Sequence, residues 1–176
     1  MPSPTKQAII ASFIKLASRK PLEKITVRDL VDDCGINRNT FYYHFQDIFA
    51  VLEEICRLAT AQVDTSLPFG EMLGNFFFIF ANYTEQYPRA VSHFAASVGQ
   101  SGAERYFAAE LDELIFTAIK QHKPDSTPEL QRTATVFLRH ALIGLCLDFV
   151  NHHGRIDKDA LAARIATLAK GVLSSL

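Results

Sequence analysis

Arg38 and Asn39 are the side chains of this chain best suited to reading a DNA sequence. An Arg guanidinium can bridge O6 and N7 of guanine, and an Asn amide can bridge N6 and N7 of adenine. Both residues follow Asn37, whose side chain can cap a helix, so they would lie in its first turn, where side chains reach base edges. Thr40 and Tyr43 would project toward a thymine methyl group or a phosphate. We therefore expect a recognition helix that begins at Arg38 and enters the major groove.

A shorter helix should precede the recognition helix and hold it in place. Thr26 and Asp29 form a capping-box variant, because the hydroxyl can accept a first-turn amide and the carboxylate lies at the positive end of the helix dipole. Gly35 can take the left-handed conformation that ends a helix. The turn between the two helices would be about three to four residues long, as a DNA-binding helix-turn-helix requires. Arg28, on the first of these helices, is a further candidate for the groove.

Residues 40–45, TFYYHF, resemble the end of the second motif helix in the TetR/AcrR family of transcriptional regulators. The family pattern is close to Thr-Leu/Phe-Tyr-x-His-Phe, and this chain matches it position by position. The resemblance covers about the first 55 residues. It implies that Tyr42 and His44 clamp phosphates and that Thr26 presents a hydroxyl and a helix N-terminus to the DNA backbone. The alternative for Tyr42 is a partly buried packing role, and the two phenylalanines of the motif are expected to anchor the core.

One position departs from the family pattern. The family commonly has Lys three residues after the final Phe of the motif, where its ammonium meets a phosphate, and this chain has Ile48. The exchange would remove one contact with the DNA backbone. In the competing interpretation, Ile48 turns into the core between the first and fourth helices, as its spacing to Val51, Leu52 and Ile55 permits.

The charges divide the chain into a basic and an acidic part. Residues 1–46 carry a net charge of +3, whereas residues 47–176 carry −4. The basic part contains the expected helix-turn-helix, so it is the part that would contact DNA. We predict a three-helix DNA-binding domain over residues 1–46 and an effector-binding and dimerisation domain over residues 47–176.

Apolar residues recur at helical spacing along the whole chain, which predicts an all-α fold with a C-terminal helical bundle and about nine helices in total. Nine is also the usual number in the family. Pro88 and the Gly99–Gly102 stretch should bracket a short sixth helix, and a seventh should stop before Pro124. The C-terminal part resembles the shorter, Firmicutes-type version of the family, which also occurs in an activator of dihydroxyacetone kinase genes.

Two C-terminal helices carry broad apolar faces that suit a four-helix contact across a two-fold axis. The residues predicted at this dimer interface are Phe137, Leu138, Ala141, Leu145, Ile165, Leu168 and Val172. The alternative is that both faces pack within their own domain. A dimer would add specificity, because two recognition helices can read successive major grooves.

Aromatic residues are concentrated in the second domain, and the chain has 14 Phe and no Trp. They could line an apolar pocket in which a few polar groups orient a ligand. The residues predicted to bind a ligand are Phe76, Phe77, Phe80, Tyr83, Phe94, Phe107, His140 and Phe149. A tightly packed core without a cavity is the alternative, and the likeness to the kinase-gene activator favours a protein partner as the signal.

Other chemistry has little support in the sequence. Cys34, Cys56 and Cys146 show no metal-binding spacing, so reduced thiols are expected, although a redox-sensing thiol is an alternative. His152 and His153 stand near Asp148, but a solvated helix end is commoner than a metal site with so few ligands. Motifs for an activated nucleophile, a phosphate loop or a catalytic metal do not occur, so we expect neither an enzyme nor a cofactor.

Together these features predict a ligand-responsive transcriptional regulator, a repressor, that binds a palindromic operator in double-stranded DNA as a homodimer. The alternative is a DNA-binding coregulator whose C-terminal domain binds a protein partner and no small molecule. The sequence opens with no signal-like apolar stretch and contains no uninterrupted apolar run of about 18 residues, so we expect a cytoplasmic protein outside the membrane.

Overall fold

The computed structural model describes residues 3–152 and 155–176, and the side chains of all of these except residues 98–104. Over this part of the chain the structure has eight α-helices, one 3-10 helix and no strand, which confirms the predicted all-α fold and its number of helices. The elements are α1 (Pro4–Ala17), η1 (Leu22–Lys24), α2 (Val27–Cys34), α3 (Arg38–His44), α4 (Ile48–Thr60), α5 (Phe69–Gln86), α6 (Pro88–His122), α7 (Pro128–Asn151) and α8 (Lys158–Ser174).

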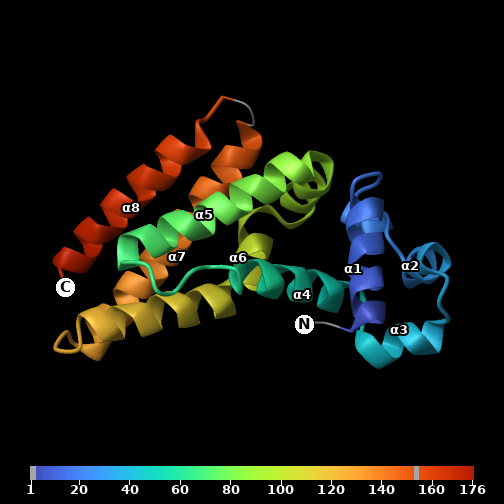
Figure 1. Ribbon diagram of the computed structural model, residues 1–176, viewed down its shortest axis with the longest axis horizontal. Coiled ribbons are helices and arrows are strands. Elements are labelled where there is room, and N and C mark those ends of the chain that lie inside the picture. Colours follow the sequence, from blue (N-terminus) through green and yellow to red (C-terminus); the bar gives the residue numbers. More distant parts are fainter. Residues whose placement is uncertain (1–2, 153–154) are drawn as a thin grey trace.

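The first three α-helices gather at one end of an elongated molecule (Figure 1). They enclose a small core in which Ile9, Leu30 and Phe41 are completely buried, and Phe45 is buried beside them. The two phenylalanines of the sequence motif are therefore core anchors, as predicted. Their burial fixes α3 on α1 and α2, so the other side chains of α3 are directed outward from a rigid support.

The C-terminal bundle consists of two helix pairs, α5 with α8 and α6 with α7 (Figure 1). Two glycines of α5 allow the first pair to approach closely. A Cβ atom at Gly74 would lie 2.7 Å from the carbonyl oxygen of Ala162, and one at Gly70 would overlap the carbonyl oxygen of Ala166. The bundle is thus held at a backbone-to-backbone distance that only glycine permits.

The prediction of a helix break at Gly99–Gly102 was wrong. Helix α6 runs without interruption through 35 residues, so the expected sixth and seventh helices are one, and η1 accounts for the total of nine. A glycine costs a helix only about 1 kcal/mol relative to alanine. Packing along the helix offsets this cost, since α6 contacts α1 and α4 as well as α5 and α7.

Helices α4 and α6 connect the two ends of the molecule. Cys56 on α4 and Ala90 and Tyr106 on α6 belong to the same buried cluster as the DNA-binding end. The predicted domain boundary after Gln46 lies just before α4, so the core of the first domain extends into helices of the second. The placement of that boundary stays a prediction.

One helix among the described residues, α7, is long and apolar enough to cross a membrane by length and composition alone. In its most apolar stretch, 44% of the residues are buried inside the fold.

Candidate nucleic-acid interface and ligand cavity

A capping box starts α2 at the position expected from the sequence. Thr26 Oγ1 accepts a hydrogen bond from the Asp29 amide at 3.2 Å, and the Asp29 carboxylate accepts one from the Thr26 amide at 2.8 Å. Lys20 Nζ lies 2.8 Å from the same carboxylate. The Lys20 ammonium, together with the hydroxyl and amide of Thr26, lowers the pKa of Asp29 from its usual 3.8 to about 2. Asp29 therefore stays ionised at neutral pH and fixes the end of α2 that would face the DNA backbone.

The turn between α2 and α3 has the geometry expected from its residues. Gly35 adopts the left-handed conformation, with φ of 68°, and ends α2. Asn37 then caps α3, because its Oδ1 accepts hydrogen bonds from the Thr40 amide at 2.8 Å and from the Thr40 hydroxyl at 3.1 Å. The hydroxyl proton of Thr40 is thus used inside the protein, and its methyl group and the two lone pairs of its hydroxyl oxygen are available to a ligand.

The polar side chains of α3 point away from the core. Arg38 and Asn39 are exposed in its first turn, and the part of the chain that the structure describes offers the Arg38 guanidinium neither an ion pair nor a hydrogen bond. Tyr43 is 85% exposed, the highest value among the exposed large hydrophobic residues, and its ring meets the edge of His44. Tyr42 contacts Phe41 edge-on but is 55% exposed, so packing is not its main role.

Arg28 is placed less favourably for contact with DNA than the residues of α3. It forms an exposed ion pair of 3.5 Å with Asp32, one helical turn further along α2. Exposed pairs of this kind contribute little and exchange easily for another anion. Arg28 can therefore reach a phosphate, but Asp32 places a negative charge beside it. The contacts of all these residues with DNA stay predictions.

Ile48 packs partly buried against the core of the DNA-binding end. It is the first residue of α4, which Asp47 caps by accepting a hydrogen bond from the Ala50 amide at 2.8 Å. This position favours the interpretation in which Ile48 turns inward.

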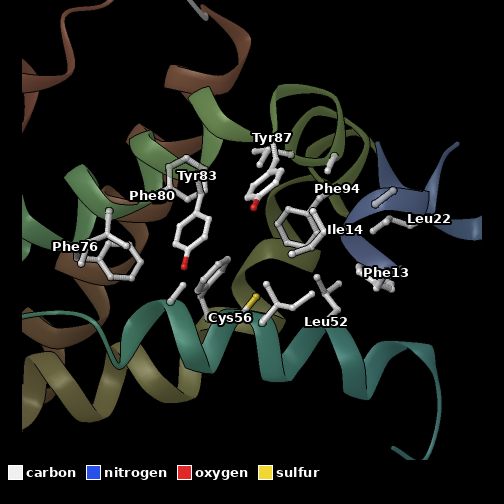
Figure 2. A pocket seen from close by; sticks show the side chains of 17 residues that line it. Phe13, Ile14, Leu22, Leu52, Cys56, Phe76, Phe80, Tyr83, Tyr87 and Phe94 are labelled. Atoms are coloured by element: carbon white, nitrogen blue, oxygen red, sulfur yellow. The ribbon is translucent and has the colours of Figure 1, made fainter. Parts of the chain in front are cut away.

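A cavity of about 120 Å³ lies between the DNA-binding end and the C-terminal bundle (Figure 2). Its walls come from α1, η1, α4, α5 and α6, and they consist almost entirely of apolar and aromatic atoms. Five of the residues predicted to bind a ligand line it, namely Phe76, Phe80, Tyr83, Phe94 and Phe107. The aromatic residues of α5 and α6 therefore do enclose a space, in addition to filling a core.

Three of the residues predicted to bind a ligand, Phe77, Phe149 and His140, do not line this cavity. Phe77 and Phe149 pack edge to face, with ring centroids 5.4 Å apart, in the core of the bundle. Phe77 follows Phe76 by one residue, which rotates it about 100° around the helix and away from the cavity. His140 lies partly buried on α7, which contributes no residue to the cavity wall.

The sequence interpretation missed the walls contributed by the first and fourth helices. Phe13, Ile14 and Ala17 of α1 and Ile55 and Cys56 of α4 line the cavity. Each of these residues has the spacing of an ordinary core residue, so the sequence contains no local signal that sets them apart.

The predicted dimer interface separates into outward and inward residues. Phe137 is 59% and Leu168 is 67% exposed, Ala141 is exposed beside Phe137, and Leu145 and Val172 are half-buried. Leu138 and Ile165 are instead buried within the bundle core of the single chain, and the interface as a whole stays a prediction. Leu138 follows Phe137 directly and therefore points to the other side of α7.

The remaining polar groups provide no evident metal site. Groups of three or more His, Cys, Asp or Glu that could hold a metal do not occur among residues 3–152 and 155–176. His152 Nδ1 lies 3.1 Å from the Asp148 carboxylate, and His153 is outside the described residues. Cys56 and Cys146 are buried, which raises the pKa of both thiols and disfavours the reactive thiolate.

A sequence profile of bacterial regulatory proteins of the tetR family matches residues 9–55, which extend from α1 into α4. Residues 9–55 therefore form a DNA-binding domain of the TetR family. The match contains the whole helix-turn-helix, with its capping box, its left-handed glycine and its exposed recognition helix. The family assignment therefore rests on the part of the protein that the sequence motif had indicated.

One relative of known name is similar over part of the chain. The chain is 33% identical over 51 residues to the uncharacterized HTH-type transcriptional regulator YerO of Bacillus subtilis (strain 168), a match that covers 29% of this chain and 18% of that protein.

Two solved structures share the whole fold. The dihydroxyacetone kinase operon activator DhaS has a TM-score of 0.69 at 16% identity, with 98% of each chain covered. A TetR transcriptional regulator from Streptococcus agalactiae has a TM-score of 0.65 at 22% identity, covering 94% of this chain and 93% of that one. These two likenesses show the fold and do not by themselves extend to function.

Proposed function

We propose that this TetR-family protein is a cytoplasmic, ligand-responsive transcriptional repressor that binds a palindromic operator as a homodimer. The observation that carries the proposal is the exposed and unpaired Arg38 beside Asn39 in the first turn of a rigidly supported α3. Arg and Asn in this position can read guanine and adenine, and Tyr43 can add a contact with a phosphate or a thymine. Tyr42, His44 and the N-terminus of α2 at Thr26 would hold the DNA backbone on either side.

The symmetry of the operator follows from a two-fold dimer. One α3 reads only a few base pairs, so two subunits are needed to span successive major grooves and reach useful specificity. The exposed side chains of Phe137 and Leu168 lie in the C-terminal bundle, on the two helices predicted to form the subunit contact. Exposed apolar residues of this size favour burial by a second copy of the chain.

Release of the operator would be a shift in population between two dimer conformations. In one, the two α3 helices match the spacing of successive major grooves; in the other, they do not. An effector that binds the second conformation more tightly lowers operator affinity by its differential affinity for the two. An effector is supported by the apolar cavity, whose walls are shared by the DNA-binding end and the bundle.

Selection of binding sites from random duplex DNA would test the proposal. We expect an enriched inverted repeat with half-site centres about one helical turn apart, or a multiple of it. The Arg38→Ala variant should lose enrichment at one position of each half-site, whereas Arg132→Ala, an exposed arginine of α7, should select the same repeat as the parent protein. Enrichment of a single unrepeated motif, or of none, would contradict the proposal.

The likeness to DhaS favours a second candidate, in which the C-terminal bundle binds a partner protein and the complex activates transcription. DhaS is an operon activator, and its fold matches along nearly the whole of both chains. Transcription in vitro from a promoter that contains the selected repeat distinguishes the two. A repressor lowers the yield of transcript with polymerase alone, whereas a coregulator changes it only when the partner is added.

A further inference from the structure

We propose that the cavity between α1 and the C-terminal bundle binds a neutral molecule the size of one aromatic ring, such as a simple phenol, and that its occupancy repositions the helix-turn-helix. The regulatory half of this inference rests on the proposed function, whereas the binding half does not. The site would lie at the junction of the two parts of the protein, with α1 as one of its walls.

The position of the cavity places a ligand against the DNA-binding end. Phe13 and Ile14 of α1 and Phe94 of α6 lie around the cavity (Figure 2), and Ile55 of α4 and Val91 of α6 also line it. A molecule in this space would contact α1, α4 and α6 together. Any change in its size would therefore change the separation of these helices, because protein interiors are close-packed.

The lining defines the charge and the size of the ligand. Among the side chains that the structure describes, none of Asp, Glu, Lys, Arg or His contributes to the wall, and burial of an unpaired charge in such surroundings is strongly unfavourable. The ligand should therefore be neutral. An apolar cavity of about 150 Å³ holds benzene, so the 120 Å³ of this cavity suits a single ring.

Two tyrosines supply the polar atoms nearest to the cavity. The Tyr83 hydroxyl is already engaged, because it accepts a hydrogen bond of 2.6 Å from Gln62 Nε2. The Tyr87 hydroxyl points toward the middle of the cavity (Figure 2), and the side chains and backbone that the structure describes provide it with no hydrogen-bond partner. Tyr87 can thus bind one polar group on an otherwise apolar ring, which favours a phenol over a pure hydrocarbon.

Contacts on both sides of α1 would transmit occupancy to the DNA-binding surface. On the cavity side, His93 Nδ1 of α6 lies 2.7 Å from the carbonyl oxygen of Ala17, the last residue of α1. On the opposite side, the Asp33 carboxylate of α2 accepts a hydrogen bond from Ser12 at 2.8 Å and pairs with Lys15 at 2.6 Å. A displacement of α1 away from the cavity would therefore carry α2, and with it α3.

Nuclear magnetic resonance of the full-length protein with labelled methyl groups locates the site. With phenol or toluene as the probe, we expect nuclear Overhauser effects from ring protons to methyl groups of Ile14, Ile55 and Val91. Ile115 and Ile143 are buried in the bundle core and serve as internal controls that should show none. Effects confined to the two core residues, or no binding at millimolar probe, would overturn the proposal.

Variants test the chemistry of the site. Tyr87→Phe should lower the affinity for phenol by about tenfold and leave the affinity for toluene nearly unchanged, because one hydrogen bond is lost and the apolar wall is kept. Ala59→Phe should fill the cavity and lower the affinity for both probes by at least about tenfold. Ala61→Phe, at an exposed position outside the cavity, should leave both affinities unchanged. Ala59→Leu is the smaller alternative if the first substitution lowers the melting temperature. Tighter binding of benzoate than of phenol would contradict the requirement for a neutral ligand.

Operator affinity, measured in the same samples, separates this inference from the proposed function. Weaker operator binding with phenol, lost in Ala59→Phe and kept in Ala61→Phe, supports both halves of the inference. Binding at the junction with unchanged operator affinity overturns the regulatory half. If a ligand releases the operator but shows nuclear Overhauser effects only to the core methyl groups, the proposed binding site is wrong while the proposed function stands.

Discussion

Glu54 of α4 lies 2.9 Å from the ammonium of Lys6 on α1 and also forms two hydrogen bonds, of 2.8 and 2.9 Å, with the guanidinium of Arg57. The carboxylate therefore connects the first helix of the DNA-binding end to the helix that leads into the bundle. Lys6 also lies 5.3 Å from the centre of the Phe45 ring, which extends this connection to the end of the recognition helix.

The Glu54 contacts should make stability depend on pH in the acid range. Arg57 and Lys6 lower the pKa of Glu54 from its usual 4.5 to about 2 in the folded protein. The stabilisation is therefore present above about pH 5 and lost as the pH falls toward 2, and it amounts to at most about 3 kcal/mol. Urea unfolding of Glu54→Gln should show a flatter pH profile between pH 5 and 3 than the parent protein. Glu53→Gln, exposed on the same helix, is the control that should keep the parent profile.

Substitutions on α3 should separate base readout from backbone contact. Arg38→Ala and Asn39→Ala should each relax base preference at one half-site position by about 1 to 3 kcal/mol. His44→Ala should instead weaken binding to operator and to random DNA alike and flatten the salt dependence of the affinity. Gel-shift titrations at several salt concentrations provide the measurement. An equal loss of specific and non-specific affinity for Arg38→Ala would remove that residue from base readout.

A charge on the outward face of the last two helices should split the dimer. Phe137→Glu and Leu168→Glu introduce a carboxylate that an apolar interface would bury without a partner, which is strongly unfavourable. Because both side chains are largely exposed in the single chain, each variant should still fold. Phe49→Glu places the same change at an exposed phenylalanine of α4 and should leave the dimer intact. Sedimentation velocity decides the matter, and dimers of unchanged affinity in both test variants would place the interface elsewhere.

The glycines of α5 and α8 give a matched test of the bundle packing. Gly70→Ala should destabilise the protein by at least about 1 to 3 kcal/mol, since its Cβ would overlap the carbonyl oxygen of Ala166. At Gly171, on the exposed side of α8, an added Cβ meets nothing within 4 Å, so Gly171→Ala should raise stability by up to about 1 kcal/mol. Thermal unfolding of the two variants should therefore shift in opposite directions, and equal shifts would argue against the close helix contact.

Local signals explain why the DNA-binding end was predictable from the sequence. The capping box of Thr26 and Asp29, the left-handed Gly35 and the cap at Asn37 each act within three residues along the chain, and the structure contains all of them. The cavity depends on long-range packing instead. Phe76 and Phe77 are adjacent in sequence, yet one lines the cavity and the other lies in the core. The same limit applies to α6, where tertiary contacts along the helix outweigh the local preference for a break at two glycines.

The last prediction concerns Ile48, where the family commonly has a lysine. In the structure this side chain packs against the core of the DNA-binding end, next to the cap of α4. Ile48→Lys should therefore lower the melting temperature, because the lost apolar contact is only partly replaced by the aliphatic stem of lysine. The slope of log affinity against log salt should stay unchanged.

A phosphate contact at this position would have a different signature. Restoring one ammonium contact per subunit would steepen the slope of log affinity against log salt by about 2 for the dimer. It would also tighten binding to operator and to random DNA equally. Measuring stability and the salt slope on the same variant distinguishes the two. A steeper slope with an unchanged melting temperature would show that position 48 faces the DNA backbone and that the isoleucine itself weakens binding.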